Sequence, residues 1–255
     1  MDQVSAPSSS SAPLPPQPML EHYYHDDQQK KVFVRSLFNR AAGNYDHAER
    51  IMAMGSGSWY RRKALERAGL KRGMYMLDVA TGTGLVARQA IAILGDVTRV
   101  VGLDPTPGML AEARRQLGIP AVLASGEQIP MPDETFDFLC MGYALRHLSD
   151  LIVTFKEFHR VLKPGATVCV LELTQPTGRI RRGLLKCYIR GVIPVLSRLT
   201  CRGRDVGDLW EYYWETIAAC VAPEKVMEAL RAAGFVDVKR HVELGMFSEY
   251  TGRKA

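Results

Sequence analysis

The sequence predicts an α/β protein with a doubly wound, mostly parallel seven-stranded sheet, helices on both faces and an antiparallel last strand. Strand-like apolar runs alternate with helical patterns through the middle of the chain, which is typical of parallel sheets. A Gly-rich turn joins the first of these strands to its helix, and two further strand-like runs follow near the end. With 255 residues, 47% of them hydrophobic, the chain is large enough for one such domain with additions.

The predicted elements begin with two helices. Residues 21–37 indicate a helical entry segment, and residues 51–68 indicate a second helix despite their two glycines. The alternating series then comprises the strands 74–80, 99–104, 121–124, 136–143 and 167–173 and the helices 84–94, 107–117 and 150–162. The late strands are 235–238 and 244–250, and we expect the second of them to be antiparallel.

Two segments lie outside this alternating series. Residues 1–20 are rich in Ser and Pro, and we expect a disordered tail because such a composition buries too little apolar surface to fold. The remaining residues, 21–255, are expected to form a single domain. Within it, a stretch at about 175–223 is too long for an ordinary connection, and we interpret it as a helical insertion on the substrate side.

The Gly-rich turn carries the most specific signal in the chain. An apolar run leads into Asp78, and Gly82, Thr83 and Gly84 follow directly before a helix. Glycines in such a turn let a ligand approach the free backbone N–H groups at the start of the helix. Nicotinamide and flavin enzymes use a similar turn. A carboxylate at Asp78, however, suits the α-ammonium group of a methionine moiety and repels a pyrophosphate. The pattern therefore indicates a site for S-adenosylmethionine.

Two further landmarks follow in the order that such a site requires. Asp104 ends the second strand, where a carboxylate can accept hydrogen bonds from both ribose hydroxyls. A third segment, residues 125–137, leads into the next strand. The alternative for Asp78 and Asp104 is a pair of turn or N-cap carboxylates. The three landmarks together favour the cofactor site.

The composition excludes several classes of function. The formal net charge of +6 does not come from one dense block of Lys or Arg, and we expect no nucleic-acid partner. The five cysteines are widely spaced and odd in number, which favours reduced thiols and a cytoplasmic location over disulfides or zinc. No run of ~18 apolar residues is present, so the sequence predicts no membrane span. Without a cluster of ligand residues, we expect no metal.

The predicted insertion has two unlike halves. In residues 180–193 basic and apolar residues segregate at helical spacing, as in a helix on a membrane surface, a lid over an apolar pocket, or an ordinary helix with a solvated basic face. Peripheral membrane contact through about 180–199 and a homodimer both remain open. The second half is dense in aromatic residues. Part of it must pack in the core, but we expect Trp210, Tyr212 and Tyr213 to contribute to binding a small hydrophobic substrate.

The order of these motifs resembles the S-adenosylmethionine-dependent C-methyltransferases of ubiquinone and menaquinone biosynthesis. The likeness runs from about residue 37 to 254 and includes the entry motif ending in Tyr-Asp, the cofactor loop, the A-E-x-L-P-F-P-D-x-T-F-D segment, the F-G-L-R-N segment and the following turn. In this chain these motifs are residues 38–46, 77–84, 127–137, 142–147 and 161–165.

The resemblance implies a Rossmann-like, class I methyltransferase with S-adenosylmethionine as its cofactor. It further implies that Tyr45 closes over the cofactor and that the following residues contact it: Thr83, Asp104, Ser125, Gly126 and Gly142. Three positions depart from the family pattern. Ser125 replaces Asn or Asp, His147 replaces Asn, and the Y-R-Y-L-x-E-S signature appears at residues 210–216 without its Arg.

Two neighbouring residues are the candidate catalytic groups. A ring carbon ortho to a phenol becomes nucleophilic when the phenol is ionised, so a methyltransferase acting there must hold near-attack geometry and manage one proton. Arg146 stays protonated and is expected to stabilise a phenolate or orient a water. His147 is the candidate base, and a helix-capping or surface role is its alternative.

The sequence therefore predicts transfer of a methyl group from S-adenosylmethionine to a ring carbon of a hydrophobic quinol or phenol. An O- or N-methyltransferase acting on another hydrophobic small molecule is the first alternative, because the substrate motifs are altered. A non-catalytic cofactor-binding module is the second, and the intact residues Asp78, Gly82, Gly84 and Asp104 argue against it.

Overall fold

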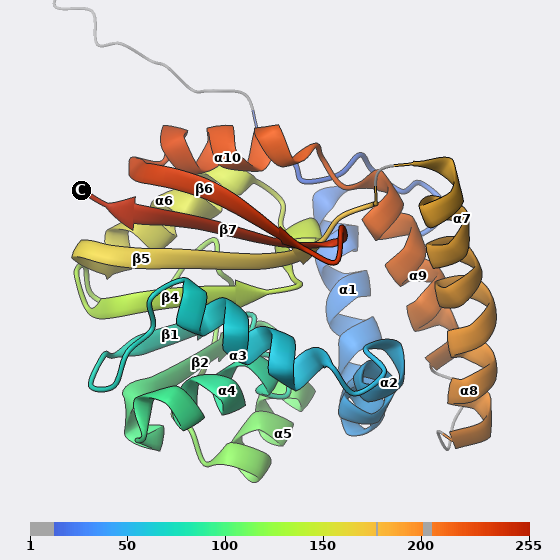
Figure 1. The fold of residues 1–255 in the computed structure, drawn as a ribbon, viewed down its shortest axis with the longest axis horizontal. Helices are drawn as coiled ribbons and strands as arrows, with labels where there is room; N and C mark the ends of the chain where they lie inside the picture. The colour runs from blue at the N-terminus through green and yellow to red at the C-terminus, as the bar shows by residue number, and fades with distance from the viewer. Residues whose placement is uncertain (1–12, 177, 201–205) are drawn as a thin grey trace, which may run out of the picture.

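The computed structural model describes residues 13–176, 178–200 and 206–255. In these residues seven strands form one sheet in the order β3-β2-β1-β4-β5-β7-β6 (Figure 1). Neighbouring strands pair in parallel except at β7, which is antiparallel to both β5 and β6. The predicted doubly wound sheet with an antiparallel last strand is confirmed. The strands are β1 (Met76–Val79), β2 (Val100–Asp104), β3 (Ala121–Leu123), β4 (Phe136–Gly142), β5 (Leu162–Leu173), β6 (Phe235–Glu243) and β7 (Phe247–Lys254).

The helices between the parallel strands lie close to their predicted limits. They are α4 (Leu85–Leu94), α5 (Pro107–Leu117) and α6 (Leu151–Val161). Local sequence signals determine where two of these helices begin. Pro107 occupies the first turn of α5, and the Asp150 carboxylate caps α6 by accepting hydrogen bonds from two backbone N–H groups.

The helix expected over residues 51–68 is wrong in its extent. The structure has two helices there, α2 (Tyr45–Met52) and α3 (Gly57–Arg67). Between them the backbone is left-handed at Met54 (φ 48°) and Gly55 (φ 76°). A right-handed helix cannot continue through two such residues, and apolar spacing alone does not reveal the break.

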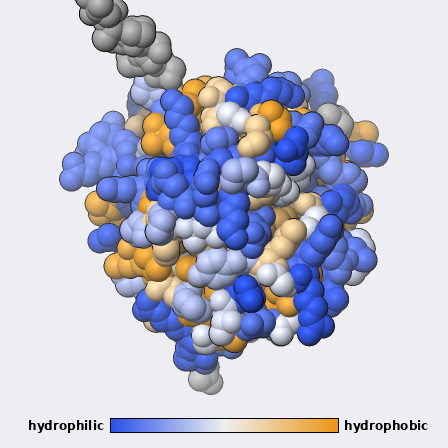
Figure 2. Space-filling view, turned by 90° about the vertical axis from the view of Figure 1, so that its left-hand side faces the viewer, coloured by the Kyte–Doolittle hydropathy of each residue, from blue (hydrophilic) through white to orange (hydrophobic). Residues whose placement is uncertain are grey.

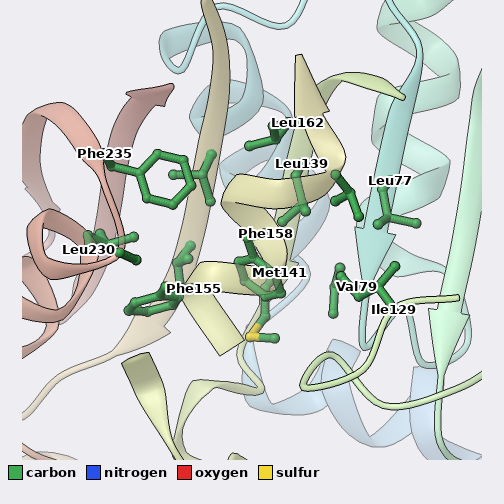
Figure 3. Packing of buried hydrophobic residues seen from close by; sticks show 14 of the residues in the cluster. Leu77, Val79, Ile129, Leu139, Met141, Phe155, Phe158, Leu162, Leu230 and Phe235 are labelled. Carbon is green, nitrogen blue, oxygen red and sulfur yellow. The ribbon is translucent and has the colours of Figure 1, made fainter. Parts of the chain in front are cut away.

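Helices cover both faces of the sheet. Helices α3 and α4 pack on one face, and α6 and α10 (Pro223–Ala232) pack on the other. On the second face Phe155 and Phe158 of α6 share a fully buried cluster with Leu139 and Met141 of β4 (Figure 3). Each such side chain contributes on the order of 2 kcal/mol through burial, so the sheet is a firm base for loops at its edge.

A third group of helices stands beyond the carboxyl ends of the parallel strands (Figure 1). From the N-terminal part come α1 (Asp27–Ala41) and α2. From the predicted insertion come α7 (Arg179–Cys187), a π-helical turn (Tyr188–Val192), α8 (Ile193–Thr200) and α9 (Val206–Ala219). These helices share their own buried cluster, which is rich in aromatic residues. The opposite end of the sheet, seen in Figure 2, is mostly hydrophilic with small separate apolar patches.

Residues 13–20 pack against the helices. The backbone N–H of Leu151 donates to the carbonyl of Leu14 at 3.0 Å, and that of Val221 donates to the carbonyl of Pro16 at 2.8 Å. The tail expected to be disordered therefore does not include this stretch, because its backbone finds partners outside itself. The first twelve residues lie outside the described part of the chain.

The surface of α7 and α8 is basic and apolar at once. Five basic side chains of the segment are exposed together with Ile180, Leu184 and Val195. In the described ranges no helix is long and apolar enough to cross a bilayer.

Candidate active site

The loop between β1 and α4 has the backbone geometry expected of a ligand-binding turn. Gly82 (φ 56°) and Gly84 (φ 91°) are both left-handed. A Cβ atom on Gly84 would lie 2.4 Å from the Cδ1 atom of Leu117, whereas a Cβ atom on Gly82 would meet nothing within 4 Å. The left-handed backbone favours glycine at position 84, where a larger residue would also displace the end of the Leu117 side chain, and Gly82 leaves its side of the loop open to a ligand.

Asp78 of β1 has one carboxylate oxygen engaged and one without a partner. Its Oδ2 atom accepts hydrogen bonds from the Thr81 hydroxyl at 2.7 Å and from the backbone N–H of Ala87 at 3.1 Å. Its Oδ1 atom is buried without a hydrogen bond. Burial raises the pKa of Asp78 to about 7, although the two hydrogen bonds oppose this shift. A buried carboxylate oxygen without a partner fits a cationic ligand group such as an ammonium.

Asp104 ends β2 and holds the same loop. Its Oδ2 atom accepts a hydrogen bond from the backbone N–H of Gly82 at 2.9 Å, and its Oδ1 atom accepts one from that of Thr106 at 2.8 Å. Burial raises the pKa of Asp104, and these hydrogen bonds lower it in part. Each carboxylate oxygen retains a further lone pair, so Asp104 can hold the loop and still accept ligand hydroxyls.

A cavity of about 100 Å³, which we call the loop cavity, opens beside these residues. Five of the predicted site residues line it: Tyr45, Gly82, Asp104, Gly142 and His147. The other lining residues are Val34, Phe38, Ala80, Pro105, Thr106, Met109, Tyr143 and Ala144. The partnerless oxygen of Asp78, the open side of Gly82 and the lone pairs of Asp104 fit the ammonium and ribose groups of S-adenosylmethionine.

The remaining predicted cofactor residues do not line this cavity; they are Asp78, Thr83, Gly84, Ser125 and Gly126. The Thr83 hydroxyl donates a hydrogen bond to the Asp46 carboxylate. The Ser125 hydroxyl oxygen accepts one from the backbone N–H of Glu127 at 3.3 Å. These residues shape the loops around the cavity.

Two of the lining residues that were not predicted from the sequence have an unusual backbone conformation. Ala80 (φ 54°) and Tyr143 (φ 61°) are left-handed although neither is a glycine. Such a conformation costs on the order of 1 kcal/mol and concentrates at functional sites. No residue type or spacing in the sequence signals it.

Tyr45, the first residue of α2, lines the loop cavity and also contacts helix α9. Its hydroxyl lies 2.9 Å from the hydroxyl of Tyr213 on α9. Burial raises the pKa of Tyr45 well above its usual value, so the phenol stays neutral.

His147 lines the loop cavity as a neutral imidazole. Its ring stacks on Tyr212 with the ring centres 5.6 Å apart, and its Nδ1 atom lies 3.4 Å from the Tyr212 hydroxyl. Its Nε2 atom is buried without a hydrogen bond. Burial, with the neighbouring charges of Arg146 and Lys30, lowers the pKa of His147 well below its usual 6.5. The ring can therefore accept a hydrogen bond or a proton at neutral pH.

Arg146 is fully buried and does not line the loop cavity. Its guanidinium forms an ion pair with Glu172 of β5 and donates through Nε to the Thr216 hydroxyl at 3.1 Å. It also lies over the ring of Tyr213, 4.5 Å from the ring centre. These contacts pair most of the guanidinium within the core, but its Nη2 atom is buried without a hydrogen-bond partner, so the catalytic role of Arg146 stays a prediction.

The three aromatic residues expected to bind substrate lie in the core. Trp210, Tyr212 and Tyr213 are at most 2% exposed, and none of them lines the loop cavity. Helix α9 is covered on several sides, since α1, α8 and the π-helical turn all pack on it. The substrate-binding interpretation of these rings is therefore not supported, because neighbouring helices occupy the faces of α9 that a ligand would need.

A second cavity, of about 380 Å³, lies between the α2–α3 turn, α7 and the β6–β7 turn. We call it the apolar cavity, because most of its lining is hydrophobic, including Met52, Leu173, Leu185 and Phe247. Tyr143 lines both cavities and so forms a wall between them. Among the described residues no group of His, Cys, Asp or Glu is placed to hold a metal ion.

Comparison with known proteins decides the family. The model of the ubiE/COQ5 methyltransferase family matches residues 25–254. The chain belongs to this family. The resemblance drawn from the motifs is thereby confirmed, and the protein is a methyltransferase.

Individual relatives of this methyltransferase agree with the family. A demethylmenaquinone methyltransferase from Staphylococcus saprophyticus is 29% identical over 220 residues, which cover 84% of this chain and 92% of that protein. A ubiquinone/menaquinone biosynthesis C-methyltransferase from Coxiella burnetii is 29% identical, covering 84% and 87%. The solved structure of a possible histamine N-methyltransferase from Thermotoga maritima has the same fold, with a TM-score of 0.59 at 19% identity, covering 86% of this chain and 99% of that one.

The pKa of Asp78 predicts pH-dependent cofactor binding. An acid whose pKa is raised to about 7 gains its charge only as the pH rises through that value. Below it, the affinity for S-adenosylmethionine should fall by up to about tenfold per pH unit, while the ligand's amine, with a pKa of about 8, stays protonated. In Asp78→Asn the affinity at neutral pH should be about tenfold lower and nearly independent of pH. Calorimetric titration at several pH values measures the affinity of wild type and of Asp78→Asn. The same pH dependence in both proteins would contradict the role of Asp78 in binding the ammonium group.

The ion pair of Arg146 predicts a stability effect. Arg146→Ala should lower the free energy of unfolding by about 3 kcal/mol, because it leaves Glu172 charged, buried and unpaired. The double variant Arg146→Met/Glu172→Leu should be much closer to wild type, since both charges are removed. Urea denaturation gives these values. A stable Arg146→Ala protein without turnover would instead restore a catalytic role for Arg146.

Proposed function

We propose that this methyltransferase transfers a methyl group from S-adenosylmethionine to a ring carbon of a hydrophobic quinol or phenol. One observation carries the proposal: the loop cavity, whose lining suits the ribose and methionine groups of the cofactor, shares the Tyr143 wall with an apolar cavity large enough for a small aromatic ring. Such an arrangement lets an apolar acceptor approach a bound methyl donor while water is kept out.

Different residues of the chain bind the cofactor and cover its site. Asp78 and Asp104 supply the two carboxylates for the ammonium and ribose groups, and Gly82 provides close access to the backbone. Tyr45 covers the cavity and is held by Tyr213. When bound, S-adenosylmethionine supplies an electrophilic methyl group, so the protein needs no nucleophile of its own.

His147 is the candidate group for handling the proton that the ring carbon loses. Its Nε2 atom is buried, lacks a hydrogen bond and belongs to a residue that lines the loop cavity. The depressed pKa keeps the imidazole neutral at pH 7, which leaves one ring nitrogen without a proton, and it also makes the imidazole a weak base.

The names of the relatives support the acceptor class. The relatives from Staphylococcus saprophyticus and Coxiella burnetii are a demethylmenaquinone methyltransferase and a ubiquinone/menaquinone biosynthesis C-methyltransferase. The predominantly apolar lining of the second cavity suits the same kind of acceptor. It equally admits the O- or N-methyl acceptors of the first alternative, so the methylated atom has to be determined.

The product identifies the methylated atom. Incubating the enzyme with S-adenosylmethionine carrying a ¹³C-methyl group and a short-chain 2-prenyl-1,4-naphthoquinol should add one methyl group to the acceptor mass. The ¹³C NMR shift should be that of a methyl group on a ring carbon. A methoxy signal, or turnover only with other phenols or amines, would establish the O- or N-methyltransferase instead.

His147→Asn tests the proton acceptor. Turnover at saturating substrates should fall by ~10²-fold, because asparagine cannot take up a proton. In wild type the acidic limb of the pH–rate profile should lie well below pH 6.5, following the lowered pKa of His147. The affinity for S-adenosylmethionine, measured by calorimetry, serves as the control and should be nearly unchanged. A fully active variant with the same profile would make His147 a structural residue.

A further inference from the structure

The apolar cavity has a polar inner end. Glu49, Tyr60, Arg61 and Tyr143 line it among residues that are otherwise largely hydrophobic. The first three come from α2 and α3, and Tyr143 follows β4 at the wall of the loop cavity. The cavity is thus amphipathic along its length, with its polar end beside the loop cavity.

Arg61 is the central group of this polar end. It is 4% exposed, and its Nη2 atom forms an ion pair with Glu49 at 2.7 Å. The guanidinium lies over the Tyr143 ring, 5.2 Å from the ring centre. The negative partners around it raise the pKa of Arg61 further although burial opposes them, so the group is always charged.

Arg61 nevertheless has an unused donor. Its Nε atom is buried without a hydrogen-bond partner, and so is the hydroxyl oxygen of Tyr60. Leaving a charged N–H group without an acceptor in an apolar setting is unfavourable, and native structures rarely do so without a reason. The Nε atom itself is not exposed to the cavity, so a ligand oxygen reaches this donor only when the Arg61 side chain, which lines the cavity, turns toward it.

The outer end of the cavity exposes several apolar side chains beside one basic residue, Arg181. Met54, Leu184 and Leu244 line it and are 81%, 66% and 74% exposed. Met54 (φ 48°) and Leu244 (φ 51°) are also left-handed, a conformation disfavoured for large side chains. Two strained turns therefore hold apolar side chains in solvent around one mouth, which is the pattern of a hydrophobic entry site.

We propose that the apolar cavity binds the acceptor, with Arg61 holding the phenolic or quinol oxygen of its ring and the Met54–Leu184–Leu244 mouth holding its apolar tail. This inference rests on the proposed function and adds the residue that recognises the ring. The permanent charge of Arg61 favours the ionised form of the phenol, which is the nucleophilic form. Tyr143 then places the ring beside the loop cavity.

The test compares two ligands that differ only in the oxygen. Calorimetry of the full chain is carried out with 2-geranylphenol and with geranylbenzene, which lacks the hydroxyl group. Wild type should bind the phenol at least tenfold more tightly. In Glu49→Gln/Arg61→Met, where both partners of the ion pair are neutral, this preference should disappear while the affinity for geranylbenzene changes by less than about threefold. Arg61→Lys should retain part of the preference.

A variant at the Met54–Leu184–Leu244 mouth tests binding of the apolar tail separately from recognition of the ring oxygen. Leu244→Asp should weaken both ligands by similar factors, and Asp tolerates the left-handed backbone of that position better than most residues. Equal binding of the two ligands by wild type, or an unchanged preference in the Glu49→Gln/Arg61→Met variant, would overturn the inference.

The outcome is independent of the reaction type. A methyl group found on oxygen or nitrogen would overturn the proposed function while the Arg61-dependent preference for the phenol stood. Carbon methylation together with an unchanged phenol preference in the double variant would support the function and remove Arg61 from it.

Discussion

The buried positive charge of Arg146 constrains everything at the carboxyl end of the sheet. A guanidinium with no exposed surface is tolerated only when its partners stay in place, because an unpaired buried charge costs several kcal/mol. Those partners come from different elements. Glu172 belongs to β5, and Thr216 and Tyr213 belong to α9. Through the Tyr213 hydroxyl the constraint extends to Tyr45 and so to α2, which lies between the two cavities.

The two halves of the site are built in different ways. The cofactor half is made from backbone: left-handed glycines, a strand end, and carboxylates that hold N–H groups of the loop. Backbone geometry of this kind demands particular residues at fixed spacing. The apolar cavity, where we propose that the acceptor binds, is made from side chains on α2, α3, α7 and the β6–β7 turn, elements far apart in the sequence. Many different combinations of side chains form an apolar cavity, so no fixed residue pattern in the sequence identifies this one.

The features that could be predicted from the sequence are those that depend on local signals. Pro107, Asp150 and the Gly82–Gly84 turn act locally, and the elements that they start were predicted within a few residues. The interruption after α2 was missed because the left-handed turn at Met54 has no sequence signature of its own.

Long-range packing accounts for the other differences. A sequence does not show how many neighbours will cover a helix, so the burial of the aromatic residues of α9 is not predicted from it. The ion pair of Arg146 is not predicted either, because its acceptor, Glu172, is 26 residues away on the neighbouring strand β5. The catalytic role of Arg146 stays a prediction.

Tyr143 lines both cavities from a left-handed position, and the guanidinium of Arg61 lies over its ring. If the two cavities hold the cofactor and the acceptor as proposed, both ligands contact this one side chain. A shift of Tyr143 caused by one ligand then changes the affinity for the other, and by thermodynamic reciprocity both affinities change by the same factor.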